Sequence, residues 1–122
     1  GDDSDVRLSL TQISMQLNWS KLSINDEKKL ILDATEVIKP MEQVNSFTSQ
    51  HLHVVLGVLE NMKTDCLERD GFIDLISCLM ASYPQLNERD AWVFVRSVKC
   101  LRSENESVRK LLSLMYSKIN YT

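Results

Sequence analysis

Residues 56–65 read Leu-Gly-Val-Leu-Glu-Asn-Met-Lys-Thr-Asp, and residues 95–104 read Val-Arg-Ser-Val-Lys-Cys-Leu-Arg-Ser-Glu. The two stretches match at an offset of 39 residues, each with apolar side chains three apart, followed by a cation, a hydroxyl residue and an acid. The apolar positions are Leu56, Leu59 and Met62 in the first stretch and Val95, Val98 and Leu101 in the second. This spacing indicates helices. A helical repeat of this length predicts units that bury their apolar faces on neighbouring units.

The composition is typical of one folded, helical domain. The chain has 122 residues, of which 43% are hydrophobic and 25% are charged, close to the averages for globular proteins. Three glycines and two prolines leave few signals for the turns of a β-sheet. We therefore expect residues 1–122 to form a single all-α domain. Because neither end of the sequence carries a domain-ending signal, we also expect the chain to be a fragment of a larger protein.

Apolar spacing and end signals predict about six helices. The expected ranges are 5–17, 26–39, 49–63, 72–83, 87–103 and 105–119, with one further helical turn at 64–71. Ser23 and Asn87 are expected to cap the starts of the second and fifth helices. Gly71 marks a bend after the helical turn at 64–71, and Pro40 ends the second helix. Gly57, inside the third helix, predicts a close neighbour or an open groove there.

Residues 67–80, Leu-Glu-Arg-Asp-Gly-Phe-Ile-Asp-Leu-Ile-Ser-Cys-Leu-Met, are followed by a loop and by an apolar helix over residues 91–101. This order of a short helix, a glycine bend, an apolar helix and a longer helix resembles one armadillo repeat. The resemblance covers residues 65–104 and implies an armadillo/HEAT-like helical stack. A compact helical bundle is the alternative fold.

No motif for catalysis, metal binding or cofactor binding is present. His51 and His53 point about 200° apart on a helix, so they cannot hold one metal ion from that helix alone. The three cysteines, Cys66, Cys78 and Cys100, have spacings that fit no standard zinc site, and the glycines form no phosphate-binding loop. We therefore expect no catalytic residues, no metal and no cofactor.

Charge and cysteine content point to an intracellular protein. A formal net charge of −3 gives no overall attraction for nucleic acid, and no apolar run is long enough to span a membrane, so neither is expected as a partner. The cysteines are odd in number and lie in apolar helical contexts, which predicts reduced core thiols in the cytoplasm or nucleus. Three Asn-X-Ser/Thr sequences, at Asn18, Asn105 and Asn120, keep secretion open.

The candidate partner-binding residues lie on two helices at repeat-related positions. They are Arg89, Trp92, Arg96 and Lys99 on the fifth helix, and His53, Gly57 and Glu60 on the third. Tryptophan and arginine are enriched in interface hot spots, and the cations favour an acidic partner segment. The armadillo resemblance implies that both helices line a groove. The alternative for Trp92 is simple packing against a neighbouring helix.

These observations predict a noncatalytic protein–protein interaction module or scaffold of an intracellular adaptor. Its partner is another protein, such as an acidic peptide segment or a helix, held in a helical groove. The alternative is a signalling regulator with a compact bundle, either a secreted four-helix cytokine-like protein or a death-fold or Bcl-2-like protein. The oligomeric state stays open.

Overall fold

The computed structural model describes residues 3–19, 21–44 and 46–119, and over these residues the fold is all-α, as predicted. The helices are α1 (Asp3–Trp19), α2 (Ile24–Ile38), α3 (Met41–Val44), α4 (Ser49–Glu60), α5 (Leu67–Ala81), α6 (Glu88–Lys99) and α7 (Glu106–Lys118). No helix in these ranges is both long enough and apolar enough to cross a membrane.

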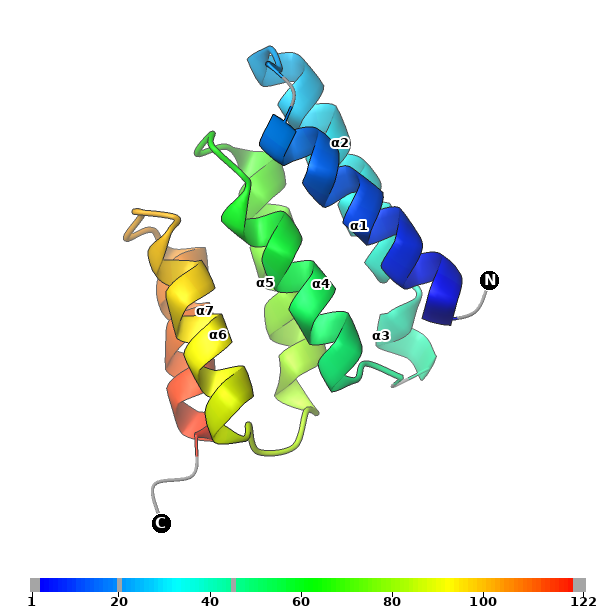
Figure 1. Ribbon diagram of the computed structural model, residues 1–122. Coiled ribbons are helices and arrows are strands. Elements are labelled where there is room, and N and C mark those ends of the chain that lie inside the picture. Colours follow the sequence, from blue (N-terminus) through cyan, green and yellow to red (C-terminus); the bar gives the residue numbers. More distant parts are fainter. Residues whose placement is uncertain (1–2, 20, 45, 120–122) are drawn as a thin grey trace.

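The helices form a stack of three antiparallel pairs in two layers (Figure 1). One layer holds α1, α4 and α6, which run in the same direction, and the other holds α2, α5 and α7, which run in the opposite direction. Within each layer the middle helix contacts both of its neighbours. The pair α4–α5 is therefore enclosed, whereas α1–α2 and α6–α7 form the two ends of the stack.

The 39-residue repeat corresponds to a helix pair. Helices α4 and α6 begin and end 39 residues apart, and α5 and α7 begin 39 residues apart. The residues that precede the helices keep the same offset, because Thr48 corresponds to Asn87 and Cys66 corresponds to Asn105. The sequence repeat thus relates the second pair of the stack to the third.

Side-chain caps at three helix starts support this arrangement. Ser23, Asn87 and Asn105 each accept a hydrogen bond from a backbone N–H three residues later. Such caps satisfy amide groups that the first turn of a helix leaves without a partner. The caps predicted from the sequence at Ser23 and Asn87 are confirmed.

The repeated apolar positions are buried where a neighbouring pair covers them. Leu56, Leu59 and Met62 on the enclosed pair are all buried, and so are Val98 and Leu101 on the third pair. Val95, the remaining one of the six repeated positions, is only half-buried. The difference is explained by the position of α6 at the end of the stack, where no further pair covers its outer face.

The predicted bend at Gly71 is wrong, because α5 runs without interruption from Leu67 to Ala81. Gly71 is exposed on this helix, and an added Cβ atom would meet no atom within 4 Å. The surroundings therefore place no demand on its backbone. Two helix ends are predicted at least three residues too late: α4 ends at Glu60 rather than residue 63, and α6 ends at Lys99 rather than residue 103. Arg102, which follows α6, has a left-handed φ of 49°.

The predicted core location is wrong for two of the three cysteines. Cys78 and Cys100 are exposed and Cys66 is partly buried, all three with free thiols. Each exposed cysteine directly precedes a leucine in the sequence but lies on an outer surface, which shows that an apolar sequence context does not guarantee burial.

One of the three glycosylation sequences has a structural role. The side-chain nitrogen of Asn105 donates a hydrogen bond to Asp70 Oδ1 at 2.8 Å, while its oxygen caps α7. That nitrogen is the atom to which a glycan would be attached, so a glycan at Asn105 would share the atom that contacts Asp70. The other two sequences, which include Ser20 and residues 120–122, extend outside the described residues.

The junction between the first two pairs is built around Glu27 of α2, whose side chain is 5% exposed. Its Oε2 atom accepts hydrogen bonds from the backbone N–H groups of Lys63 and Thr64, at 3.0 and 2.8 Å. Its Oε1 atom accepts one from the Thr64 hydroxyl at 3.1 Å. This carboxylate therefore satisfies the loop between α4 and α5 and fixes that loop against α2.

We predict that Glu27→Ala lowers the free energy of unfolding by about 2–4 kcal/mol, because two backbone donors lose their charged acceptor. Urea denaturation measures this change. The control is Glu36→Ala, which removes an exposed carboxylate from the same helix. Equal effects of the two substitutions would show that the Glu27 contacts contribute no net stability.

We also predict that Gly71→Ala raises the free energy of unfolding by about 0.5–1 kcal/mol, since alanine is the better helix former and has open space here. Thermal denaturation measures the change. A destabilised Gly71→Ala protein would instead favour a bend at this position.

Candidate functional site

The four predicted residues of α6 are all exposed, but they lie on two edges of the helix. Arg89 borders a polar cleft together with His53 of α4, and the Nε atom of Arg96 lies 3.8 Å from Glu60 Oε1. Trp92 and Lys99 line a different hollow, between α6 and α7. The predicted stripe thus divides into an arginine edge that faces α4 and a Trp92–Lys99 edge that faces the end of the stack.

The three predicted residues of α4 contact the neighbouring helices of the same layer, α6 and α1. His53 Nε2 lies 2.7 Å from Asp90 Oδ1 of α6, and Glu60 Oε1 accepts a hydrogen bond from the Ser97 hydroxyl at 2.8 Å. Gly57 faces α1 on the other side, where an added Cβ atom would lie 3.5 Å from Ser14 Oγ. The structure therefore does not bring the seven predicted residues together into one groove between α4 and α6.

Asp90 organises the contact between the N-terminal parts of α4 and α6. The residue is only 4% exposed, and its Oδ2 atom accepts a hydrogen bond from the Ser49 hydroxyl at 3.0 Å. Ser49 and His53 thus contact the two oxygens of the same carboxylate. In a Ser-His-Asp triad the histidine lies between the serine and the acid, so the order of contacts here is different.

The buried carboxylate of Asp90 affects the pKa of Tyr83, which precedes α6. Burial raises the pKa of the Tyr83 hydroxyl above its ordinary value of 10.0, the negative charge of Asp90 raises this pKa further, and the hydrogen bond with Ser49 opposes the rise. The Tyr83 ring also meets Phe47 edge-on, with ring centroids 6.0 Å apart. Tyr83 therefore joins Ser49 and Asp90 in one polar cluster and packs against Phe47.

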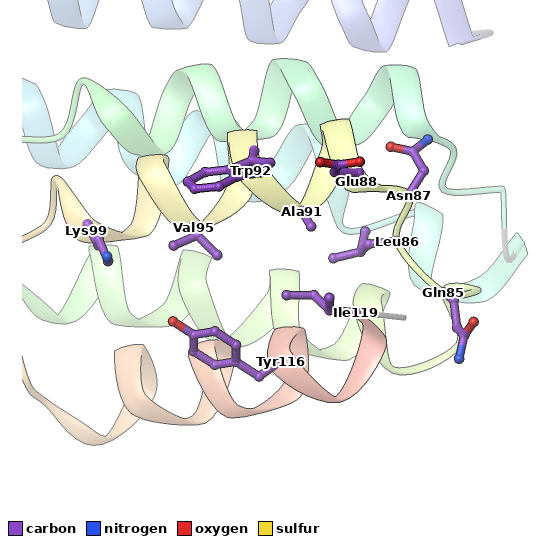
Figure 2. Close-up of a pocket in the computed structure, with 10 residues that line it drawn as sticks. All are labelled: Gln85, Leu86, Asn87, Glu88, Ala91, Trp92, Val95, Lys99, Tyr116 and Ile119. Atoms are coloured by element: carbon purple, nitrogen blue, oxygen red, sulfur yellow. The ribbon is translucent and has the colours of Figure 1, made fainter. Parts of the chain in front are cut away.

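The hollow between α6 and α7 is an apolar groove of about 770 Å³. Its lining includes the apolar side chains of Leu86, Ala91, Trp92, Val95, Tyr116 and Ile119. Figure 2 shows Trp92 on α6 and Tyr116 on α7 on opposite sides of the groove, with Val95 and Ile119 between them. Trp92 is 70% exposed and Tyr116 is 46% exposed, so two aromatic walls are available to a ligand.

A backbone hydrogen bond closes one end of the groove, and two oppositely charged side chains lie along α6. At one end, the backbone N–H of Leu86 donates to the carbonyl of Lys118 at 2.8 Å, which joins the loop before α6 to the end of α7. Along α6, Glu88 contributes a carboxylate at the first turn and Lys99 contributes an ammonium group at the last. These positions are about 16 Å apart at 1.5 Å per residue.

The groove has the composition of a recognition site. Aromatic and aliphatic side chains with a few polar groups at the rim are typical of sites that bind apolar side chains of a ligand. Within the described ranges, no group of three or more His, Cys, Asp or Glu side chains is placed to hold a metal ion. The lining of the groove is thus mostly apolar, with charged side chains at Glu88 and Lys99.

Sequence reasoning found Trp92 and Lys99 but missed the other wall. Tyr116 and Ile119 lie on α7, and Leu86 lies in the loop before α6. The available signal was the 39-residue repeat, which places α6 and α7 in one pair. Tyr116 lies next to the buried core position Met115 on α7 and is itself exposed. An aromatic side chain outside the core positions of a helix was thus a second signal.

Comparison of the chain with protein-family models, with curated proteins and with solved structures finds no match.

We predict that Tyr83 ionises above pH 10.0 in the folded protein and that Asp90→Asn lowers its pKa, because a negative charge is removed. Tyrosinate absorbance measures this pKa in a background with Tyr116→Phe and Tyr121→Phe, where Tyr83 is the only tyrosine. An unchanged pKa in Asp90→Asn would exclude the electrostatic contribution of Asp90.

The raised pKa of Tyr83 also affects the free energy of unfolding at alkaline pH. Because the pKa of Tyr83 is higher in the folded than in the unfolded state, its contribution to stability is full below about pH 10. That contribution is lost as the pH rises through the pKa of the folded protein. Tyr83→Phe should therefore reduce the loss of stability above pH 10 in urea titrations.

Proposed function

We propose that this chain is a noncatalytic protein–protein interaction module, and that it binds a helical segment of a partner protein in the groove between α6 and α7. The observation that carries the proposal is Trp92, which is 70% exposed on an apolar groove and opposite Tyr116. Exposed aromatic residues that border an apolar hollow are the usual anchors of protein interfaces.

The dimensions of the groove favour a helical partner segment. Helix α6 is 12 residues long, about three turns, and the groove follows it from Glu88 to Lys99. An amphipathic helix of similar length places apolar side chains at spacings of three and four along one face. Such a face matches the row of Ala91, Val95 and Trp92 on α6 and the facing Tyr116 on α7.

The relation to armadillo and HEAT proteins is part of this proposal. Support comes from three stacked helix pairs and from the 39-residue offset between the second and third pairs. The uninterrupted helix α5 favours the two-helix unit of HEAT repeats over the three-helix unit of armadillo repeats. Modules of this kind present extended surfaces to partner proteins.

An intracellular location also belongs to the proposal. Free, exposed thiols at Cys78 and Cys100 are typical of proteins in reducing compartments. The use of the Asn105 amide in a contact with Asp70 removes support for glycosylation at that position. Both features favour the adaptor over the secreted cytokine-like alternative.

We predict that Trp92→Ala weakens the binding of helical peptides to the groove by about 30-fold or more, as expected for a hot-spot residue. Peptides of about 12 residues with an amphipathic pattern are selected from a displayed library against the wild-type protein. Isothermal titration calorimetry then measures their affinity for each variant.

The matched control is Trp19→Ala. Trp19 is 72% exposed, so it is as accessible as Trp92, but it lies on α1 at the opposite end of the stack. We expect less than a twofold change for this variant. Selected peptides that tolerate Trp92→Ala as well as Trp19→Ala would refute the groove as the binding site.

A further inference from the structure

The outer face of α6 corresponds, through the 39-residue repeat, to the face of α4 that packs against α6. Three residues of α4 make polar contacts to α6: Ser49 and His53 bond to Asp90, and Glu60 bonds to Ser97. Their counterparts 39 residues later are Glu88, Trp92 and Lys99. All three counterparts line the apolar groove. In the repeat, the groove therefore corresponds to the surface of α4 that receives α6.

The repeat also predicts the direction of that helix. Helices α1, α4 and α6 run in the same direction in their layer (Figure 1), and the contacts between α4 and α6 join N-terminal part to N-terminal part and C-terminal part to C-terminal part. A helix that continues this layer runs parallel to α6.

The charges at the groove differ from those at the enclosed interface. Where α4 presents the carboxylate of Glu60 to α6, α6 presents the ammonium group of Lys99. A second reversal occurs in the other layer, where Asp70 of α5 accepts a hydrogen bond from Asn105 and its counterpart on α7 is the exposed Arg109. The surface offered to the next helix is thus basic where the preceding one was acidic.

From these relations we infer that the partner segment is an acidic amphipathic helix that lies parallel to α6, with its acidic side chain against Lys99. This inference rests on the proposed function and specifies the chemistry of the partner. In the enclosed interface, Asp90 and Ser97 of the incoming helix make the hydrogen bonds and lie seven residues apart. Arg96, next to Ser97, also lies 3.8 Å from the Glu60 carboxylate. At the position that corresponds to Asp90, the partner helix has a non-acidic polar residue, which lies opposite Glu88. At the position that corresponds to Ser97, seven residues later, it has Asp or Glu, which lies opposite Lys99.

A second copy of this chain fits the groove less well. The helix it would contribute in this layer is α1, which begins the stack, and residues 8–19 of α1 carry no charged side chain. Nothing on that stretch can pair with Lys99. The charge of the groove therefore favours a different protein over self-assembly.

The test uses a displayed library of 14-residue amphipathic peptides in which every non-apolar position is randomised. We expect selection against the wild-type protein to enrich Asp or Glu at one position in the C-terminal half of the peptide. Lys99→Glu should weaken the selected peptides about tenfold, and replacing that acid by Lys should restore binding to Lys99→Glu. The control is Lys110→Glu, which makes the same charge change on α7 beside a different hollow, lined by Ser77 and Ser113.

Orientation is measured with a spin label on the peptide N-terminus. A parallel helix broadens the NMR signals of residues near Glu88, whereas an antiparallel helix broadens those near Lys99. Broadening near Lys99 would overturn the assigned direction, and the absence of acid enrichment would overturn the assigned charge.

These outcomes are separate from failure of the proposed function. Peptides that need Trp92 but are indifferent to Lys99→Glu would leave the binding groove in place and remove the acidic partner. Peptides that need neither Trp92 nor Lys99 would remove both. A concentration-dependent dimer in sedimentation equilibrium that Trp92→Ala abolishes would overturn the assignment to another protein and identify a second copy as the occupant.

Discussion

No helix pair in this chain can bury its apolar residues by itself, and the rest of the structure follows from that constraint. A pair of antiparallel helices has apolar side chains on the faces that point along the stack as well as between its helices. These faces lose their contact with water only when another pair covers them, which is the condition that produces helical stacks. The enclosed pair α4–α5 satisfies this condition on both sides. The pair α6–α7 satisfies it on one side, which leaves Val95 half-buried and Trp92 exposed.

Buried carboxylates determine how the pairs meet. Glu27 accepts hydrogen bonds from the loop of the second pair, and Asp90 accepts them from Ser49 and His53 of α4. A buried carboxylate without such partners is costly, so each of these contacts restricts the position of one pair on the next. The apolar core supplies most of the driving force for stacking, while the carboxylates select one arrangement.

Two repeat positions have different roles in α4 and in α6. At the enclosed interface, His53 and Glu60 bond to α6, whereas their repeat counterparts, Trp92 and Lys99, line an open groove. The replacement of an imidazole and a carboxylate by an indole and an ammonium group changes a surface that bonds to α6 into an exposed surface with different shape and charge. The proposed acidic partner follows from this change in charge.

The presence of the helices and their 39-residue repeat are readable from the amino-acid sequence. The 39-residue repeat is a pattern in the residue order, and the caps at Ser23 and Asn87 depend only on residues nearby in the sequence. Both can therefore be recognised without tertiary information. The continuity of α5 through Gly71 and the exposure of Cys78 and Cys100 depend on tertiary contacts, because the surroundings of a residue determine whether a local signal is used. Trp92 faces Tyr116 across a groove while His53 and Glu60 pack against α6, since contacts between helices distant in the sequence depend on how the pairs stack.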